Sequence, residues 1–272
     1  MKWAARIFVF LLCAFAATPL VWYGLSSLKN AAELAQIPPT FLPSHITLEN
    51  YSELFARRPF AVYYLNSVVV ASLASLLCIV CASLMAYRLA RAPRPFRAAV
   101  SYILLVLAFF PPIVLVFPVY EMVRFAGLAN RLWSLIVPYA ALNLPFAVWL
   151  LTGYMEQIPC ELEEAAAIDG LSAFQTYRTI MMPLAAPALV TAFLLVFIFS
   201  WNEFMFALTF MSLESSRTVT VGVATLSGAF SYEIPWGMLA AGIVVSTVPL
   251  IIAVALFQKR IVAGLTAGSL KQ

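Results

Sequence analysis

Six long apolar runs, separated by short polar segments, constrain the fold of this chain more than any other feature. They cover roughly residues 5–28, 63–87, 98–122, 133–154, 184–208 and 237–258. Each reaches the ~20 residues that a helix needs to cross the hydrocarbon core of a bilayer. The whole chain is 64% hydrophobic and 10% charged, far less charged than a soluble domain. We therefore predict an all-α polytopic membrane protein with about six transmembrane helices, forming a single transmembrane domain over residues 1–272.

The basic residues predict which side of the membrane each loop faces. Lys2 and Arg6 precede the first run, and Lys259 and Arg260 follow the last. The short second loop holds four arginines, Arg88, Arg91, Arg94 and Arg97. By the positive-inside rule these segments are cytoplasmic, and an even number of spans places both termini there. The first apolar run is too long for a signal peptide, so we expect it to remain as an uncleaved helix.

Two longer segments are expected on the opposite side of the membrane. The first, about 29–62, contains Pro38, Pro39 and Pro43 and is predicted to form a short helix near Leu48–Phe55. His45, the only histidine, is interpreted as a solvated loop residue rather than a ligand. The second, 209–236, contains Thr218–Val223, which we interpret as a loop in preference to a small gate element.

The segment from Pro159 to Met182 predicts two short helices that meet at a glycine. Proline suits a first helical turn, and the acidic residues Glu161, Glu163 and Glu164 suit the positive end of the helix dipole. Gly170 is a natural helix stop. Ser172-x-x-Gln175 is typical of a capping box that opens a second helix. The expected product is a compact knob.

Small and charged residues give this knob the properties of a docking element. Ala165 and Ala166 keep one helix face small, so that a partner surface can approach closely. Asp169 falls at the helix C-terminus, where the dipole disfavours an anion. We therefore expect Asp169 to have a partner, either on another protein or across the helix pair at Arg178.

The spacing of this segment resembles a known family motif. Glu164-Ala165-Ala166 is followed by three residues and Gly170, and then by nine residues and Ile180-Met181-Met182-Pro183. This matches the EAA loop of ABC importer membrane subunits, with Met182 where leucine is usual. The chain therefore resembles a type I ABC importer permease subunit with a MetI-like fold. The resemblance implies that the loop, about 156–183, couples to an ATPase through Glu163, Glu164, Ala165, Ala166, Asp169, Gly170, Arg178 and Pro183.

The resemblance also implies partners and a location. They are a homologous second permease subunit, two ATPase subunits, an extracytoplasmic substrate-binding protein and the lipid of a bacterial cytoplasmic membrane. The sequence has no P-loop, because none of its lysines, Lys2, Lys29, Lys259 and Lys271, follows a glycine. We expect a transporter subunit rather than an enzyme, with no cofactor or metal in this chain and with ATP and Mg²⁺ on the ATPase subunits. The net charge of +4 is spread over loops and indicates no nucleic-acid partner.

The fifth apolar run carries Trp201-Asn202-Glu203, which we predict to border the transport path together with Asn143 of the fourth run. An acid in the middle of a membrane helix is costly, so it should face a partner or a wet cavity. An aromatic face beside hydrogen-bonding groups suits a sugar, while an interhelical polar clamp remains an equal alternative. The pattern resembles sugar permeases of the maltose-transporter class. Pro111-Pro112 in the third run and Pro145 in the fourth are typical of broken or kinked helices.

The last residues, about 259–272, are expected to form a cytoplasmic tail. Gly264 to Lys271 resembles the ending of maltose-type permeases, with Gln272 where glycine is frequent. The resemblance implies that Gly264, Thr266, Gly268 and Ser269 contact the ATPase pair.

These observations predict the permease subunit of a binding-protein-dependent importer that moves a carbohydrate, most simply a di- or oligosaccharide, into the cytoplasm. Glycerol-3-phosphate or a polyol is an alternative solute. An ion-coupled secondary transporter would explain Glu203 as an ion site, but it would leave the EAA pattern and the tail unexplained. A membrane scaffold without transport activity is a further alternative.

Overall fold

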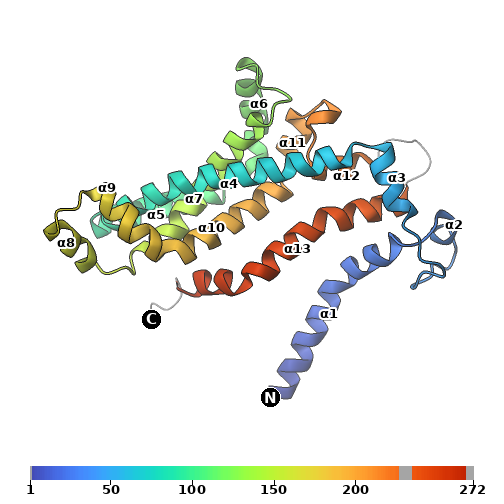
Figure 1. The fold of residues 1–272 in the computed structure, drawn as a ribbon, viewed down its shortest axis with the longest axis horizontal. Helices are drawn as coiled ribbons and strands as arrows, with labels where there is room; N and C mark the ends of the chain where they lie inside the picture. The colour runs from blue at the N-terminus through green and yellow to red at the C-terminus, as the bar shows by residue number, and fades with distance from the viewer. Residues whose placement is uncertain (1, 227–234, 268–272) are drawn as a thin grey trace. The chain divides into compact units, whose positions relative to one another are not determined.

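The computed structural model describes residues 2–226 and 235–267, and within these ranges the chain forms helices and no strands (Figure 1). The longer helices are α1 (Lys2–Ser26), α4 (Phe60–Ala90), α5 (Arg94–Ala108), α7 (Trp133–Met155), α10 (Met182–Asn202) and α13 (Trp236–Ala267). The shorter ones are α2 (Ala31–Leu34), α3 (Glu49–Arg57), η1 (Pro112–Leu115), α6 (Val116–Phe125), α8 (Glu161–Ile168), α9 (Ala173–Thr176), η2 (Tyr177–Met181), α11 (Met205–Phe210), η3 (Glu214–Ser216) and α12 (Val219–Leu226).

Contacts between residues divide the chain into two compact units. One contains Met1–Leu65 and Arg217–Ile251, and the other contains Asn66–Ser216 and Ile252–Gln272. Helices α4 and α13 contribute to both units. The sequence predicted a single domain over residues 1–272, and each unit is described separately below.

The expected membrane spans are largely confirmed. Among the described residues, five helices are long and apolar enough to cross a membrane, or six if one bent pair counts as a span. The five are Ala5–Ser26, Phe60–Ala90, Trp133–Met155, Ala173–Asn202 and Trp236–Gln258. The all-α prediction with about six spans is therefore correct.

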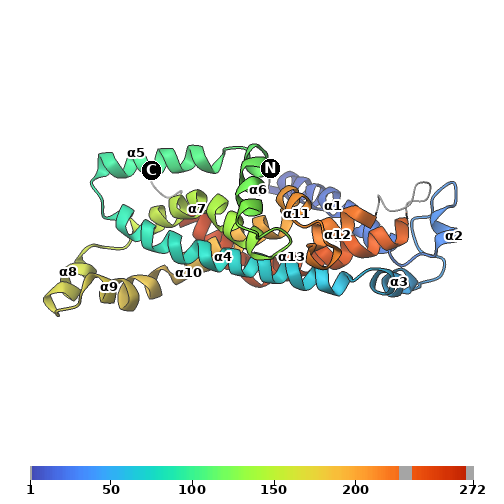
Figure 2. The same ribbon diagram turned by 90° about the horizontal axis from the view of Figure 1, so that it is seen from above.

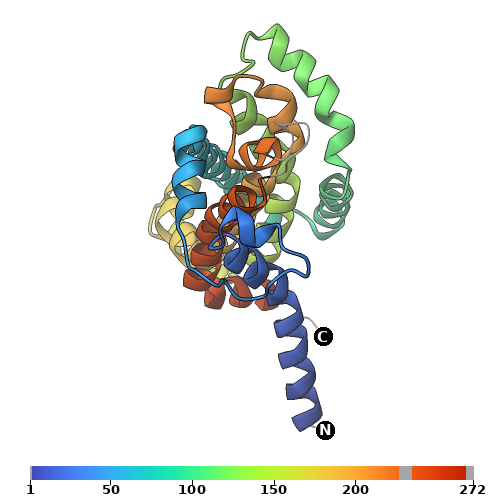
Figure 3. The same ribbon diagram turned by 90° about the vertical axis from the view of Figure 1, so that its right-hand side faces the viewer.

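The third expected span, 98–122, is not one continuous helix. The chain bends by 79° between α5 and the η1–α6 segment, and Figure 3 looks nearly along α5 and shows η1 and α6 running across it. Pro111 and Pro112 lie at the bend. A proline has no N–H to donate and its ring clashes with the preceding turn, which explains the break. The sequence indicated a weak point here but not its angle.

The first unit corrects one interpretation and confirms another. Thr218–Val223 was interpreted as a loop, but Val219–Leu226 forms the helix α12. Gly222 lets α12 approach α4 closely, because a Cβ atom there would lie 2.4 Å from Cδ2 of Tyr63. The predicted short helix near Leu48–Phe55 is present as α3.

The second unit has its core between α4, α7 and α10. Alanine is the most frequent residue in this core, and the buried alanines include Ala82, Ala86, Ala147, Ala185 and Ala192. Small residues let membrane helices approach closely, which supplies the van der Waals contact that replaces the hydrophobic effect in lipid. Figure 2 shows α8 and α9 projecting beyond the ends of α7 and α10. This core therefore carries a two-helix projection at one end.

Candidate functional site: a braced helical knob

The predicted local structure of the knob is confirmed. Helix α8 begins at Glu161 with three glutamates in its first turn, and its C-cap is Asp169. Gly170 adopts φ 82°, in the left-handed region that favours glycine. The capping box is complete: the Ser172 N–H donates to Oε1 of Gln175 at 2.7 Å, and the Gln175 N–H donates to Oγ of Ser172 at 3.4 Å.

The tip of this knob is open to solvent. Glu164, Ala165, Asp169 and Gly170 are exposed, and the neighbouring apolar side chains Ile168 and Phe174 are also exposed. A Cβ atom added at Gly170 would meet no atom within 4 Å. Ala166 differs from its neighbour because it is buried. The tip therefore offers a glycine-containing surface on which exposed apolar side chains lie beside two carboxylates.

The inner side of the knob is fixed by Arg91, at the end of α4. Its Nε donates to Oε1 of Glu163 at 2.5 Å, while its other nitrogens donate to the carbonyls of Met155 at 3.2 Å and Ile158 at 3.1 Å. The Tyr87 hydroxyl donates to Oε2 of Glu163 at 2.9 Å. We call this group, Arg91, Glu163, Tyr87 and the two carbonyls, the arginine brace. Glu163 thus points away from the open tip, unlike Glu164.

A second ion pair supports the same loop. Nε of Arg97 lies 3.1 Å from Oε1 of Glu156, and the Arg97 guanidinium also donates to the carbonyl of Ala90 at 3.0 Å. The sequence accounted for these arginines only as positive-inside charges. The structure gives two of them, Arg91 and Arg97, a second role as supports of the 156–163 segment.

The far side of the knob is fixed by Tyr177. Its hydroxyl lies 2.8 Å from Oγ of Ser83 in α4, and its ring packs on Tyr87 with centroids 5.5 Å apart. Tyr177 opens η2, a π-helical turn that precedes α10. Pro183, which has no N–H for the helical ladder, follows this turn. The knob is therefore held to α4 on both sides of its free tip.

The structure bears on one of the two partners expected for Asp169, namely Arg178 across the helix pair. Asp169 and Arg178 are both exposed, and no hydrogen bond or ion pair joins these two described residues. A bond across the helix pair is therefore absent from this structure.

The sequence placed Glu203 in the middle of a membrane helix. In the structure it lies at a helix end instead. It is the C-cap of α10, with φ −66° and ψ 133°. Its carboxylate accepts hydrogen bonds from the hydroxyl of Tyr139 in α7 and from the N–H groups of Phe206 at 2.9 Å and Ala207 at 3.2 Å. We call Glu203, Tyr139 and these two amides the glutamate clamp. It links α7 to the α10–α11 junction.

The other predicted path residues have different environments. Trp201 is 2% exposed and its ring stacks on Phe197 with centroids 5.7 Å apart, so it has no open face for a sugar in this structure. Asn202 is exposed, and its amide donates to the carbonyl of Ile198 at 2.8 Å. Asn143 donates to the carbonyl of Tyr139 at 2.8 Å. Asn202 is thus the most accessible of the four.

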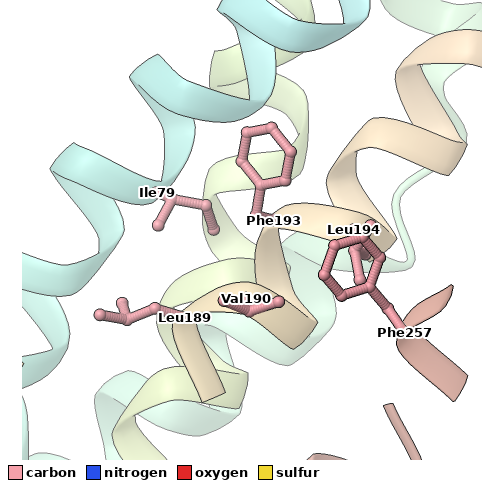
Figure 4. Close-up of a pocket in the computed structure, with 6 residues that line it drawn as sticks. All are labelled: Ile79, Leu189, Val190, Phe193, Leu194 and Phe257. Carbon is pink, nitrogen blue, oxygen red and sulfur yellow. The ribbon is translucent and has the colours of Figure 1, made fainter. Parts of the chain in front are cut away.

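A cavity within the second unit is apolar. It has a volume of about 340 Å³ and is lined by Ile79, Leu189, Val190, Phe193, Leu194 and Phe257. Figure 4 shows four of these side chains on α10, with Ile79 and Phe257 on either side. A sugar hydroxyl buried there would have no hydrogen-bonding partner, so this cavity does not suit a carbohydrate.

Helix α13 continues into the predicted tail as far as Ala267, so Gly264 and Thr266 lie in the last turns of this helix. Gly268 and Ser269, the other two predicted contact residues, lie outside the described residues.

Comparisons with known proteins agree with the motif. Residues 78–266 match the family described as binding-protein-dependent transport system inner membrane component. The chain is 41% identical over 272 residues to the trehalose/maltose transport system permease protein MalG of Thermococcus litoralis, covering 97% of this chain and 94% of that protein. It is 39% identical over 253 residues to the sulfoquinovosyl glycerol transport system permease protein SmoH of Agrobacterium fabrum, covering 93% and 88%.

Solved structures show the same fold. One chain of a bacterial ABC transporter involved in the import of the acidic polysaccharide alginate superposes with a TM-score of 0.79 at 24% identity, covering 94% of both chains. A chain of the alginate transporter in complex with an alginate pentasaccharide-bound periplasmic protein gives a TM-score of 0.65 at 16% identity, covering 94% of this chain and 93% of that one.

Proposed function

This chain belongs to the family of binding-protein-dependent transport system inner membrane components, and we propose that it is the permease subunit of a carbohydrate importer. It would form the pore together with a homologous second permease. An extracytoplasmic binding protein would deliver the solute to the outward face. Both termini would lie in the cytoplasm, in agreement with the basic residues of the cytoplasmic loops.

The names of the relatives support a carbohydrate as the solute. Two relatives are named for the transport of trehalose and maltose and of sulfoquinovosyl glycerol, and the solved transporter is described as importing alginate. These solutes are glycosides or saccharides of different charge, so a di- or oligosaccharide is the simplest common class. Glycerol-3-phosphate or a polyol remains the alternative.

The braced knob carries the proposal for energy coupling. Its tip is exposed and carries both apolar and acidic side chains, while its base is tied to α4 through Glu163 and Tyr177. A surface that is free at the tip and fixed at the base can receive a push from a partner and pass it to a membrane helix. We propose that an ATPase subunit docks on Glu164, Ala165, Asp169 and Gly170, and that two such subunits hold the ATP and Mg²⁺. Arg178 and Pro183 would border the same contact.

The transport path is proposed to run past Asn202 rather than past Trp201. Asn202 is exposed and offers both a donor and an acceptor. Glu203 would hold the surrounding helices through the glutamate clamp. A cysteine at Asn202 should react with small water-soluble thiol reagents in at least one transport state, whereas failure to react in every state would exclude it from the path.

The tail is proposed to contact the ATPase pair through Gly264, Thr266, Gly268 and Ser269. Cysteines placed at Thr266 or Ser269 should form crosslinks to the ATPase. Crosslinks confined to the permease would overturn this assignment.

Uptake into vesicles tests the function as a whole. Vesicles that contain the complete complex and internal ATP should accumulate a labelled saccharide that the binding protein presents. Omitting the ATPase should abolish uptake, even when a proton or sodium gradient is imposed. Uptake that follows the gradient without the ATPase would instead favour an ion-coupled secondary transporter.

A further inference from the structure

The segment that follows α1 is organised around two buried charged residues. Lys29 is 2% exposed and Glu33 is 4% exposed. The Lys29 ammonium donates to the carbonyl of Thr40 and to its Oγ1 at 3.1 Å, and the Thr40 hydroxyl donates to Oε1 of Glu33 at 2.9 Å. The Ser44 N–H donates to the same oxygen at 2.9 Å. These hydrogen bonds tie both ends of the 40–44 segment, at Thr40 and Ser44, to Lys29 and Glu33.

This arrangement sets Phe41 against the end of α1. The Phe41 ring meets the Trp22 ring edge to face, with centroids 5.8 Å apart. The Lys29 ammonium lies 5.4 Å from the centroid of the same Trp22 ring. Phe41 nevertheless remains 76% exposed and Leu42 71% exposed. Two large apolar side chains are therefore presented outward beside a membrane-spanning helix.

The depth of Trp22 fixes the depth of Phe41. The apolar span of α1 runs from Ala5 to Ser26, 22 residues, which at ~1.5 Å per residue is about 33 Å. That length matches a hydrocarbon core of about 30 Å. Trp22 lies four residues before the end of the span and hence about 6 Å inside it along the helix axis. A ring in edge contact with Trp22 lies at a similar depth.

The backbone on either side of Phe41 and Leu42 carries few hydrogen-bond donors. Polar backbone groups at membrane depth must find partners within the protein. Pro38, Pro39 and Pro43 have no N–H to satisfy, and the Thr40 carbonyl accepts from the buried Lys29. These three prolines thus lower the number of backbone donors beside the exposed side chains of Phe41 and Leu42.

We propose that Thr40–Leu42 folds back into the outer lipid interface and inserts Phe41 and Leu42 among the lipids, forming an anchor between the first external segment and the bilayer. Lipid is the occupant because the exposed side chains of Phe41 and Leu42 continue the exposed apolar surface of α1, and because tryptophan and lysine at a span end are typical of the interface. The assignment to the outer leaflet rests on the proposed orientation, whereas the depth does not.

Spin-label depth measurements on the reconstituted complex test this proposal. Single-cysteine variants would carry a nitroxide at Phe41→Cys or Leu42→Cys. The natural Cys13, in the middle of α1, gives the lipid reference, and His45→Cys, which is exposed, gives the water reference. We expect the ratio of collisions with oxygen to collisions with a water-soluble nickel chelate to be several-fold higher at 41 and 42 than at 45. The depth should lie between those of Cys13 and residue 45.

Two results would overturn the proposal. A ratio equal to that at residue 45 would place the segment in water. Shielding of both labels from oxygen and from nickel would mean that another protein chain covers the segment. Lys29→Gln should mobilise the label at Phe41 and lower its ratio, because it removes the support of the Thr40 carbonyl. Reaction of His45→Cys with an impermeant maleimide from the cytoplasmic side would refute the proposed orientation without affecting the measured depth.

Discussion

Glu163 and Glu203 are both carboxylates that hold helices together, but they are satisfied in different ways. Glu163 faces a guanidinium at 2.5 Å in a partly hydrated site, where both side chains are 20% exposed. Glu203 accepts from a tyrosine hydroxyl and from the first N–H groups of α11. An ion pair near water can break and re-form because water can solvate each partner. The carboxylate of Glu203 is held by three donors at once, a hydroxyl and two backbone amides, and releasing it would leave all three without an acceptor. This difference suggests that the Arg91–Glu163 ion pair at the base of the knob can open and re-form, whereas the glutamate clamp stays closed.

The largest effect is expected at the tip that the arginine brace supports. Gly170→Trp should abolish uptake and weaken ATPase attachment, because it adds a large side chain where a partner is proposed to dock. Gly170→Asn is the matched control, since asparagine tolerates the left-handed conformation and is much smaller. Uptake and co-purification of the ATPase would be measured for both variants. Normal uptake with tryptophan would show that the tip makes no close contact.

Removing the glutamate clamp should have the next largest effect. Glu203→Ala would leave the Tyr139 hydroxyl and two amides without their acceptor, at a cost of about 2–4 kcal/mol in stability. Thermal unfolding of the purified complex should therefore occur at a lower temperature. Glu203→Gln keeps an acceptor oxygen and should cost about half as much. Equal, unchanged melting temperatures in both variants would show that the clamp is not structural.

Breaking the arginine brace should cost less stability than removing the glutamate clamp. Its effect should fall mainly on uptake. Glu163→Gln and Arg91→Met should each lower uptake about tenfold, equivalent to about 1.4 kcal/mol of coupling, while leaving ATP hydrolysis largely intact. The double variant should lose little more than Arg91→Met alone, because both changes remove the Arg91–Glu163 bond and only Arg91→Met also removes the two bonds to carbonyls. Additive losses would show that the two residues act independently. Arg57, paired with Glu53 on an exposed helix face, provides a control in Arg57→Met.

Glu33 is a third carboxylate to compare with Glu163 and Glu203, and here we expect the smallest effect, a change in local mobility with pH. The Ser44 N–H, followed by the Thr40 and Ser44 hydroxyls and Lys29, lowers the pKa of Glu33 below its ordinary value of 4.5, although burial opposes this shift. The ionised form is thus favoured in the fold. Its contribution to local stability is complete above pH 4.5 and is lost as the pH falls through the lowered pKa. A spin label at Leu42→Cys should become mobile only below pH 4.5. In Glu33→Gln this pH step should disappear.

Local features of the knob could be predicted from the sequence because they depend on neighbouring residues. The stop at Gly170 and the capping box at Ser172 and Gln175 are encoded within a few positions, and both are present. The arginine brace could not be predicted in this way, since it joins Arg91 to a residue 72 positions away. The positive-inside rule had already accounted for Arg91, so no unexplained charge remained to suggest a pair.

The position of Glu203 was missed for a related reason. No glycine or proline lies next to it to indicate that α10 ends there. Its bonds to the amides of Phe206 and Ala207 resemble an N-cap, but glutamate is not among the preferred N-cap residues. Pro111 and Pro112 did indicate a break, while the 79° bend depends on packing that the sequence does not specify.

The three-way contact of Arg91 has a mechanical consequence. One planar guanidinium joins the end of α4 to Glu163 on α8, to the carbonyl of Met155 at the end of α7 and to the carbonyl of Ile158 just beyond it. A load applied to α8 is therefore shared by two long helices instead of bending the short linker between α7 and α8. In the proposed complex with an ATPase on the knob, we expect the stiffness of this joint to set how much of each ATPase movement reaches the membrane helices. If this contact were weaker, part of each movement would bend the linker between α7 and α8. The number of ATP molecules consumed per solute would then rise before transport itself stopped.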